Sequence, residues 1–255
     1  MIANYHTHTA RCNHAVGEDE EYVRSALEGG LKLLGFSDHT PLHFPGTYYS
    51  HSRMRPHLMP DYVESVRSLQ RKYAGQIQIP LGVEAEYYPG LWQDMLAMLR
   101  HHGVEYMLLG QHWNGDEEGY APNKRPSDDI DRLKQYVHQV CTAMDTGLFS
   151  YFAHPDYIQF TGDIGVYRQH MRTICQVAKQ TNTPLEINLN GLHAKHHYPT
   201  PLFWELAAEQ GCSVVIGSDA HDPMQVVNSD YEATAMDLVD RFGLHLLPTI
   251  ELRSI

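Results

Sequence analysis

Short apolar runs alternate with amphipathic stretches along the whole chain. Seven apolar runs predict buried strands: one that ends within residues 4–9, and then 31–37, 77–83, 104–110, 149–153, 184–190 and 213–218. Apolar residues at helical spacing predict helices near 17–29, 60–73, 91–101, 127–144, 166–180, 201–210 and 231–242. Seven strand-then-helix units predict an α/β fold built on a parallel barrel.

The sequence shows no natural point of division. Its 255 residues suffice for one large α/β domain, and no linker or low-complexity tract interrupts them. We therefore expect a single domain spanning residues 1–255. The longest interruption is the 40–59 loop, which is rich in His, Tyr, Pro and Arg. Loops of this length are usually functional or mobile, so this one is a candidate lid.

Composition argues against several classes of protein. The formal net charge of −12, with acidic residues spread along the chain, disfavours a nucleic-acid partner. The four cysteines lie far apart without Cys-x-x-Cys spacing, which disfavours a disulfide framework or a cysteine zinc site. No run approaches the roughly 20 apolar residues of a membrane span, and no basic, apolar signal begins the chain. We expect no membrane partner and a cytoplasmic location, and the oligomeric state is open.

Candidate chemistry begins with His6 and His8 at the end of the first predicted strand. Side chains at i and i+2 of an extended segment leave the same face, so the two imidazoles point together. Imidazole suits zinc, iron and nickel, but two ligands make only half a metal site. The remaining ligands must come from elsewhere in the chain.

Other predicted strands also end in His, Asp or Glu. The carboxyl ends of parallel barrel strands share one rim, so residues distant in sequence converge there. A lone buried histidine is usually just hydrogen-bonded, but a large group at one rim indicates a metal site. We call this group the rim cluster: His6, His8, His14, His39, Glu84, His112, His154, Asp219 and His221.

Six short motifs resemble the polymerase-and-histidinol-phosphatase (PHP) family. They are His6-x-His8, Ser37-Asp38-His39, Gly82-Val83-Glu84, Gly110-Gln111-His112, Ala153-His154-Pro155 and Ser218-Asp219-Ala220-His221. The resemblance covers nearly the whole chain, and within the family it is strongest to stand-alone histidinol-phosphate phosphatases. It implies a distorted (β/α)7 barrel with three divalent metal ions.

The same resemblance assigns ligands to each ion. It implies a first ion on His6, His8, Glu84 and Asp219, and a second on His112 and His154 with Glu84 bridging. The third would lie on His14, His39 and His221. Zinc, iron or manganese would fit such shells, whereas nitrogen-rich ligands argue against magnesium or calcium alone.

The implied chemistry is phosphate-monoester hydrolysis, most simply of L-histidinol phosphate. A hydroxide bridging the first two ions would attack phosphorus, which makes Glu84 and Asp219 the candidate catalytic residues. Three alternatives stay open. They are another PHP phosphoesterase acting on nucleotide, sugar or phosphotyrosine esters, a metal-dependent amidohydrolase, and a non-catalytic PHP module.

The residues that would bind the small phosphorylated substrate are less clearly marked. Basic side chains in loops after strands could pair with phosphate: Arg11, Arg53, Arg55, Lys124, Arg125 and Lys195. Lys195 and His193 are preferred because they leave the sixth strand at the rim, and Arg11 is retained beside them. The sequence departs from the pattern of histidinol-phosphate phosphatases where it carries Gln159 and His193 near places at which those enzymes are expected to have arginine.

Overall fold

The computed structural model of the chain describes residues 1–115 and 117–255. Its strands pair in parallel, as the alternation of strands and helices predicts. They are β1 (Ala3–Asn4), β2 (Leu33–Leu34), β3 (Gly82–Ala85), β4 (Tyr106–Leu109), β5 (Phe149–Phe152), β6 (Leu185–Asn188), β7 (Ser213–Gly217) and β8 (His245–Leu246).

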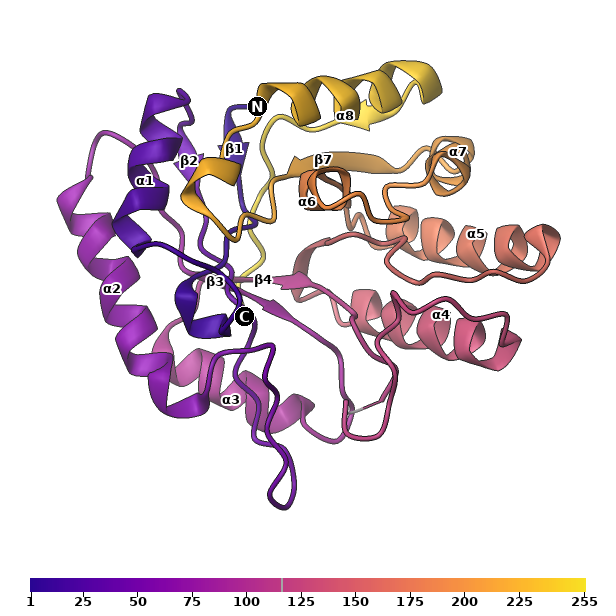
Figure 1. The fold of residues 1–255 in the computed structure, drawn as a ribbon, viewed down its shortest axis with the longest axis horizontal. Helices are drawn as coiled ribbons and strands as arrows, with labels where there is room; N and C mark the ends of the chain where they lie inside the picture. The colour runs from indigo at the N-terminus through magenta and orange to yellow at the C-terminus, as the bar shows by residue number, and fades with distance from the viewer. Residues whose placement is uncertain (116) are drawn as a thin grey trace.

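Helices follow the strands and lie around them (Figure 1). They are α1 (Asp19–Glu28), α2 (Met59–Lys72), α3 (Trp92–His102), α4 (Ile130–Asp145), α5 (Ile164–Gln180), α6 (Leu189–His193), α7 (Pro201–Glu209) and α8 (Ser229–Phe242). Short 3-10 turns are η1 (Ala10–Cys12), η2 (Pro56–Leu58) and η3 (Pro223–Gln225). All seven predicted helices are present within a few residues of their expected bounds.

The strands form a distorted (β/α)7 barrel. Strands β3 to β8 make one sheet in chain order, and β1 pairs with β2. Single parallel bridges join Leu33 to Gln78 and Phe36 to Leu81, which connects the β2 segment to the β3 segment. On the other side, the amide of His8 donates to the carbonyl of Ala220 at 2.9 Å, which connects the β1 segment to the β7 segment. The predicted barrel is confirmed.

The floor of the barrel is filled by side chains from several strands. Tyr106 is fully buried, and its hydroxyl donates to the carbonyls of Tyr5 at 2.7 Å and Phe36 at 3.1 Å. One side chain therefore ties β4 to the β1 and β2 segments. Space for it exists because two neighbours lack a Cβ: an added Cβ would lie 2.2 Å from Tyr106 at both Gly35 and Gly82.

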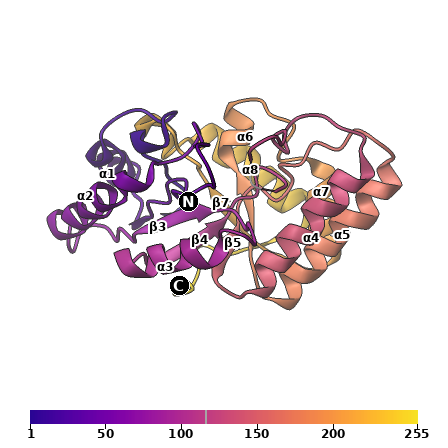
Figure 2. The ribbon, with the colours of Figure 1, turned by 90° about the horizontal axis from the view of Figure 1, so that it is seen from below.

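A second and larger apolar core lies between the strands and the helices. Helix α4 illustrates it, because Leu133, Tyr136 and Val140 recur at helical spacing and are fully buried. Figure 2 shows α4 and α5 side by side on the outside of the barrel. Because the helices cover the outer faces of the strands, the open rim is left for polar side chains.

Three local features differ from the sequence expectations. Residues 189–193, expected as the end of a strand and the start of a loop, form α6, because the Asn188 side chain accepts from the amide of Gly191 and caps the helix. The strands are shorter than the apolar runs, since polar rim residues leave the sheet. The two-residue strand β8, with one exposed and one half-buried side chain, pairs with β7 and was not predicted. No helix in the described part of the chain is long and apolar enough to cross a membrane.

Candidate metal centre

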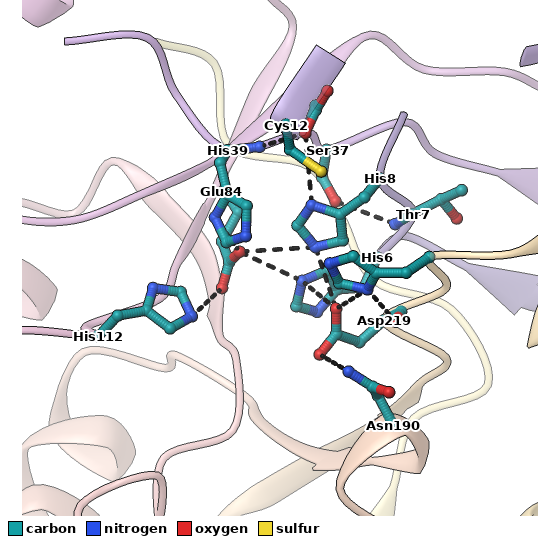
Figure 3. Close-up of polar contacts among 12 residues, drawn as sticks. His6, Thr7, His8, Cys12, Ser37, His39, Glu84, His112, Asn190 and Asp219 are labelled. Carbon is teal, nitrogen blue, oxygen red and sulfur yellow. Dashed lines mark hydrogen bonds and ion pairs between the residues drawn. The ribbon is translucent and has the colours of Figure 1, made fainter. Parts of the chain in front are cut away.

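The rim cluster converges at one end of the barrel, around a cavity of about 470 Å³. Seven of its nine members line that cavity: His14, His39, Glu84, His112, His154, Asp219 and His221. His6 and His8 have no exposed surface and lie against the carboxylates of Glu84 and Asp219 (Figure 3). Residues from six separate strand ends are thereby gathered in one place.

The first group of possible ligands is built on the adjacent imidazoles of His6 and His8, whose ring centroids are 5.1 Å apart. Nε2 of His8 lies 3.0 Å from Oδ1 of Asp219, and Nε2 of His6 lies 3.5 Å from the same oxygen. Oε2 of Glu84 lies 3.6 Å from each Nε2. The side-chain amides of Asn188 and Asn190 donate to Oδ2 of Asp219, which leaves Oδ1 facing the imidazoles.

Two further groups adjoin the first. Oε1 of Glu84 lies 2.9 Å from Nε2 of His154 and 3.5 Å from Nε2 of His112. Glu84 therefore faces both this pair and the first group, so its two oxygens could serve an ion in each. Ligand atoms of His14, His39 and His221 lie within 4.8 Å of one another and make a third group.

The buried polar atoms at the centre lack partners of their own. Atoms without a hydrogen bond include Nε2 of His6, His8 and His221, Oε2 of Glu84, and Oδ1 of Asp219. Buried polar atoms in folded proteins almost always have a hydrogen-bond partner. A group of buried nitrogen and oxygen atoms that face one another without such partners therefore indicates a ligand between them. Imidazole nitrogens and carboxylate oxygens are the donors that divalent transition metals take. The residues present therefore fit divalent metal ions.

Carboxylates behind the imidazoles fix which nitrogen faces the centre. Nδ1 of His6 lies 2.8 Å from Glu186, and Nδ1 of His112 lies 2.8 Å from Glu86. Such partners hold the tautomer and the ring orientation of a metal-binding histidine. Neither glutamate was predicted from the sequence. Glu86 shares the strand face of Glu84 by i, i+2 alternation, and Glu186 is a charged residue within a largely apolar predicted strand, so both signals were present.

Glycines leave room for the key carboxylates. A Cβ at Gly110 would lie 1.9 Å from Oε1 of Glu84, and a Cβ at Gly217 would lie 1.9 Å from Oε1 of Glu186. Two candidate ligands also have left-handed backbone conformations, with φ of +34° at His154 and +49° at Asp219. Such conformations cost on the order of 1–3 kcal/mol in a non-glycine residue and cluster at functional sites.

The carboxylates affect the pKa values of the histidines around the centre differently. Burial opposes the charged form of His8, but the nearby carboxylates of Asp219 and Asp38 outweigh it and raise the pKa to about 9. Burial, reinforced by the charge of His8, lowers the pKa of His221 to about 3. For Glu84, burial is outweighed by His112, His39 and His6, which hold its pKa well below the usual value. A metal cation bound among these carboxylates would supply the positive charge that a protonated His8 supplies without it.

The three residues expected to bind substrate do not line the cavity. Lys195 is exposed, His193 at the end of α6 packs edge-on against Tyr231 of α8, and Arg11 is held by Asp19 and Asp61 in a separate hollow. None of the three therefore faces the rim cluster in this structure.

Other side chains take the places next to the rim cluster. They are His51, Ser52, Trp113, Pro122, Lys124, Tyr157, Asn190, His196 and Tyr198. Among the described residues, Lys124 is the one lysine or arginine in the lining. It was one of six basic candidates in the sequence, and nothing in the pattern singled it out. His51, Ser52 and His196 were not predicted, because loop geometry decides which loop residues face inward.

The sequence and the fold both resemble known proteins. The model of the family described as PHP domain matches residues 4–190. A probable histidinol-phosphatase of Deinococcus radiodurans is 31% identical over 234 residues, with 88% of each chain covered. The histidinol-phosphatase of Bacillus subtilis is 22% identical over 253 residues, covering 85% of this chain and 92% of that protein.

A solved structure supports the same fold. The crystal structure of a histidinol phosphate phosphatase from Lactococcus lactis, complexed with zinc, L-histidinol and phosphate, has a TM-score of 0.75. The two chains are 17% identical, and the match covers 98% of this chain and 96% of that one. A likeness at this identity shows a shared fold.

Proposed function

Because the chain belongs to the PHP domain family, we propose that it is a metal-dependent phosphatase that converts L-histidinol phosphate and water to L-histidinol and phosphate. The observation that carries the proposal is the set of buried, unpartnered imidazole and carboxylate atoms facing one another at the rim. Such a centre binds divalent ions, and bound divalent ions lower the pKa of water and neutralise charge on phosphoryl oxygens.

We assign three ions to the three groups of side chains. His6, His8, Glu84 and Asp219 would hold the first, and Glu84 with His112 and His154 the second. His14, His39 and His221 would hold the third, since their ligand atoms lie within 4.8 Å of one another. Zinc, iron and manganese all suit this mixture of nitrogen and oxygen donors. Glu84 and Asp219 are the catalytic candidates, because each faces more than one imidazole at the point where a phosphoryl group would lie.

Lys124 is placed to receive the phosphate. The next residue back, Asn123, is fully buried: its amide donates to the carbonyl of His112 at 2.6 Å, and its own carbonyl accepts from the amide of Gln159 at 3.0 Å. This double attachment directs Lys124 to the cavity wall. An ammonium group there would pair with an anionic ester, a role that Lys195, His193 and Arg11 would fill only after a rearrangement.

The aromatic wall suits a flat substrate. Tyr157 and Tyr198 have ring centroids 5.4 Å apart, and Trp113 lines the cavity near His112. An imidazole-bearing alcohol could stack on these rings. The amidohydrolase and non-catalytic alternatives have no such support, since the relatives reported above are named as phosphatases and the rim cluster is gathered around one cavity.

A panel of esters tests the proposal. The metal-loaded protein should hydrolyse L-histidinol phosphate with a kcat/KM at least tenfold above that for a nucleotide monophosphate, a sugar phosphate and phosphotyrosine. Equal or greater efficiency on one of the other esters would assign the protein to a different PHP phosphoesterase activity. A cytoplasmic location and a single domain spanning residues 1–255 stay predictions of the sequence.

A further inference from the structure

Arg53, at the end of the 40–53 part of the long loop, is buried with only 2% of its surface exposed. Its guanidinium forms a two-pronged contact with one carboxylate: Nη1 lies 2.8 Å from Oε2 of Glu86, and Nη2 lies 2.9 Å from Oε1. Nη2 also donates to Glu117, which comes from the loop that follows β4. A single buried arginine thus joins two rim loops to the end of β3.

Glu86 passes this contact on to the candidate metal centre. The same Oε1 that accepts from Arg53 lies 2.8 Å from Nδ1 of His112. The opposite nitrogen of that ring, Nε2, faces Glu84 at 3.5 Å. Arg53, Glu86 and His112 are therefore consecutive links, and the guanidinium fixes the direction in which the carboxylate presents its oxygen to the imidazole.

Arg53 also fixes the path of its own loop. Nη1 donates to the carbonyl of Thr40 at 3.1 Å, and the Thr40 hydroxyl and amide both donate to the carbonyl of Glu84. The carbonyl of Arg53 accepts from the side chain of Asn13 at 3.1 Å, next to His14. The loop is closed on itself by these bonds, and His51 and Ser52, which line the cavity, directly precede the anchored residue.

We propose that Arg53 is a positioning residue for the metal centre, which orients His112 through Glu86 and holds His51 and Ser52 in the cavity wall. This inference rests on the metal centre of the proposed function. The 40–59 loop is held in place at Thr40 and Arg53, so at those two points it forms a fixed wall of the cavity rather than a free lid.

Metal binding tests the role of Arg53 without relying on turnover. The metal-free protein is loaded with zinc, desalted, and its ions per chain are counted, and zinc affinity is measured by calorimetry. Arg53→Met should lower the affinity for the zinc ion at His112 by roughly 10–100-fold, the usual effect of removing a hydrogen-bond partner of a metal ligand. After desalting, the variant should therefore retain one ion fewer per chain than the unmodified protein. The matched control is Arg55→Met, since Arg55 lies in the same loop and stacks on Tyr49 away from Glu86.

A second variant distinguishes a loss of metal binding from a failure to fold. Should Arg53→Met fail to fold, Arg53→Lys decides, because lysine keeps the charge but cannot form the two-pronged contact, and zinc affinity should still fall about tenfold relative to Arg55→Lys. Unchanged zinc stoichiometry and affinity in the folded Arg53 variant would overturn the inference. The zinc readout needs no substrate, so an unmodified protein that binds three ions yet hydrolyses no phosphate ester would refute the proposed function alone.

Discussion

Oε1 of Glu84 lies 2.9 Å from Nε2 of His154, although 70 positions separate the two residues in the chain. Glu84 leaves the end of β3, and His154 follows the end of β5. Their approach places a carboxylate between imidazoles of different strands, where it faces two candidate ion positions at once. If the protein is a metal-dependent phosphatase, this carboxylate is the side chain on which its metal centre depends most.

Replacing Glu84 should therefore remove both metal and activity. Glu84→Ala is expected to lower kcat for phosphate-ester hydrolysis on the order of 100- to 1,000-fold, because charge stabilisation at the phosphoryl group is lost. Metal analysis of the same variant should show fewer ions per chain. Glu64→Ala is the control, since Glu64 is an exposed glutamate on α2 paired with Arg71. Near-normal turnover of Glu84→Ala with a full set of ions would rule out the proposed role of Glu84.

A single added methyl group at Gly110 should have a similar effect. The new Cβ of Gly110→Ala would lie 1.9 Å from Oε1 of Glu84, so the carboxylate must move away from His154. We expect loss of the second ion and at least a tenfold fall in kcat. Gly90→Ala, whose Cβ would meet no atom within 4 Å, should behave like the unmodified protein. Equal activity of the two variants would show that Glu84 tolerates displacement.

Lys124 should affect substrate binding more than chemistry. Lys124→Ala is expected to raise KM for a phosphate ester about tenfold, which corresponds to one charge-assisted contact, with kcat within about twofold. Lys134→Ala, on the outer face of α4, is the control. Lys195→Ala is measured in parallel. A rise in KM for Lys195→Ala and none for Lys124→Ala would show that the sequence-based choice of Lys195 was right and the structural choice wrong.

The stability of the barrel should depend in part on the hydroxyl of Tyr106. Tyr106→Phe removes the donor that serves the carbonyls of Tyr5 and Phe36, and the cost of leaving a buried acceptor short of a partner is about 1–3 kcal/mol. Thermal unfolding should show a lower Tm, while Tyr120→Phe, at an exposed position, should leave Tm unchanged. A Tm for Tyr106→Phe equal to that of the unmodified protein would mean that the barrel closes without this bond.

The elements that were predicted correctly are those with a local signal. Apolar runs and helical spacing predicted seven strands and seven helices, and the alternation of His6 and His8 predicted that their imidazoles adjoin. The strand β8 has two exposed or half-buried residues and therefore no local signal. Helix α6 begins with a cap at Asn188, but that residue lies within the apolar run 184–190, which predicts a strand.

The candidate site was less completely predictable than the fold. The rim cluster could be collected because each member follows a strand, and parallel strands end at one rim. Which loop cation faces the cavity depends on long-range bonds such as those of Asn123, so Lys124 could not be separated from Lys195. Glu86 and Glu186 were not predicted, because their place behind His112 and His6 depends on contacts with histidines from other strand segments.

The most direct test of the central claim is phosphate release from L-histidinol phosphate, measured while the metal-free protein is titrated with zinc. The account predicts no hydrolysis without metal, activity that rises until three ions are bound per chain, and loss of activity on chelation. Hydrolysis that persists in the metal-free protein, or three bound ions with no phosphate released, would contradict it.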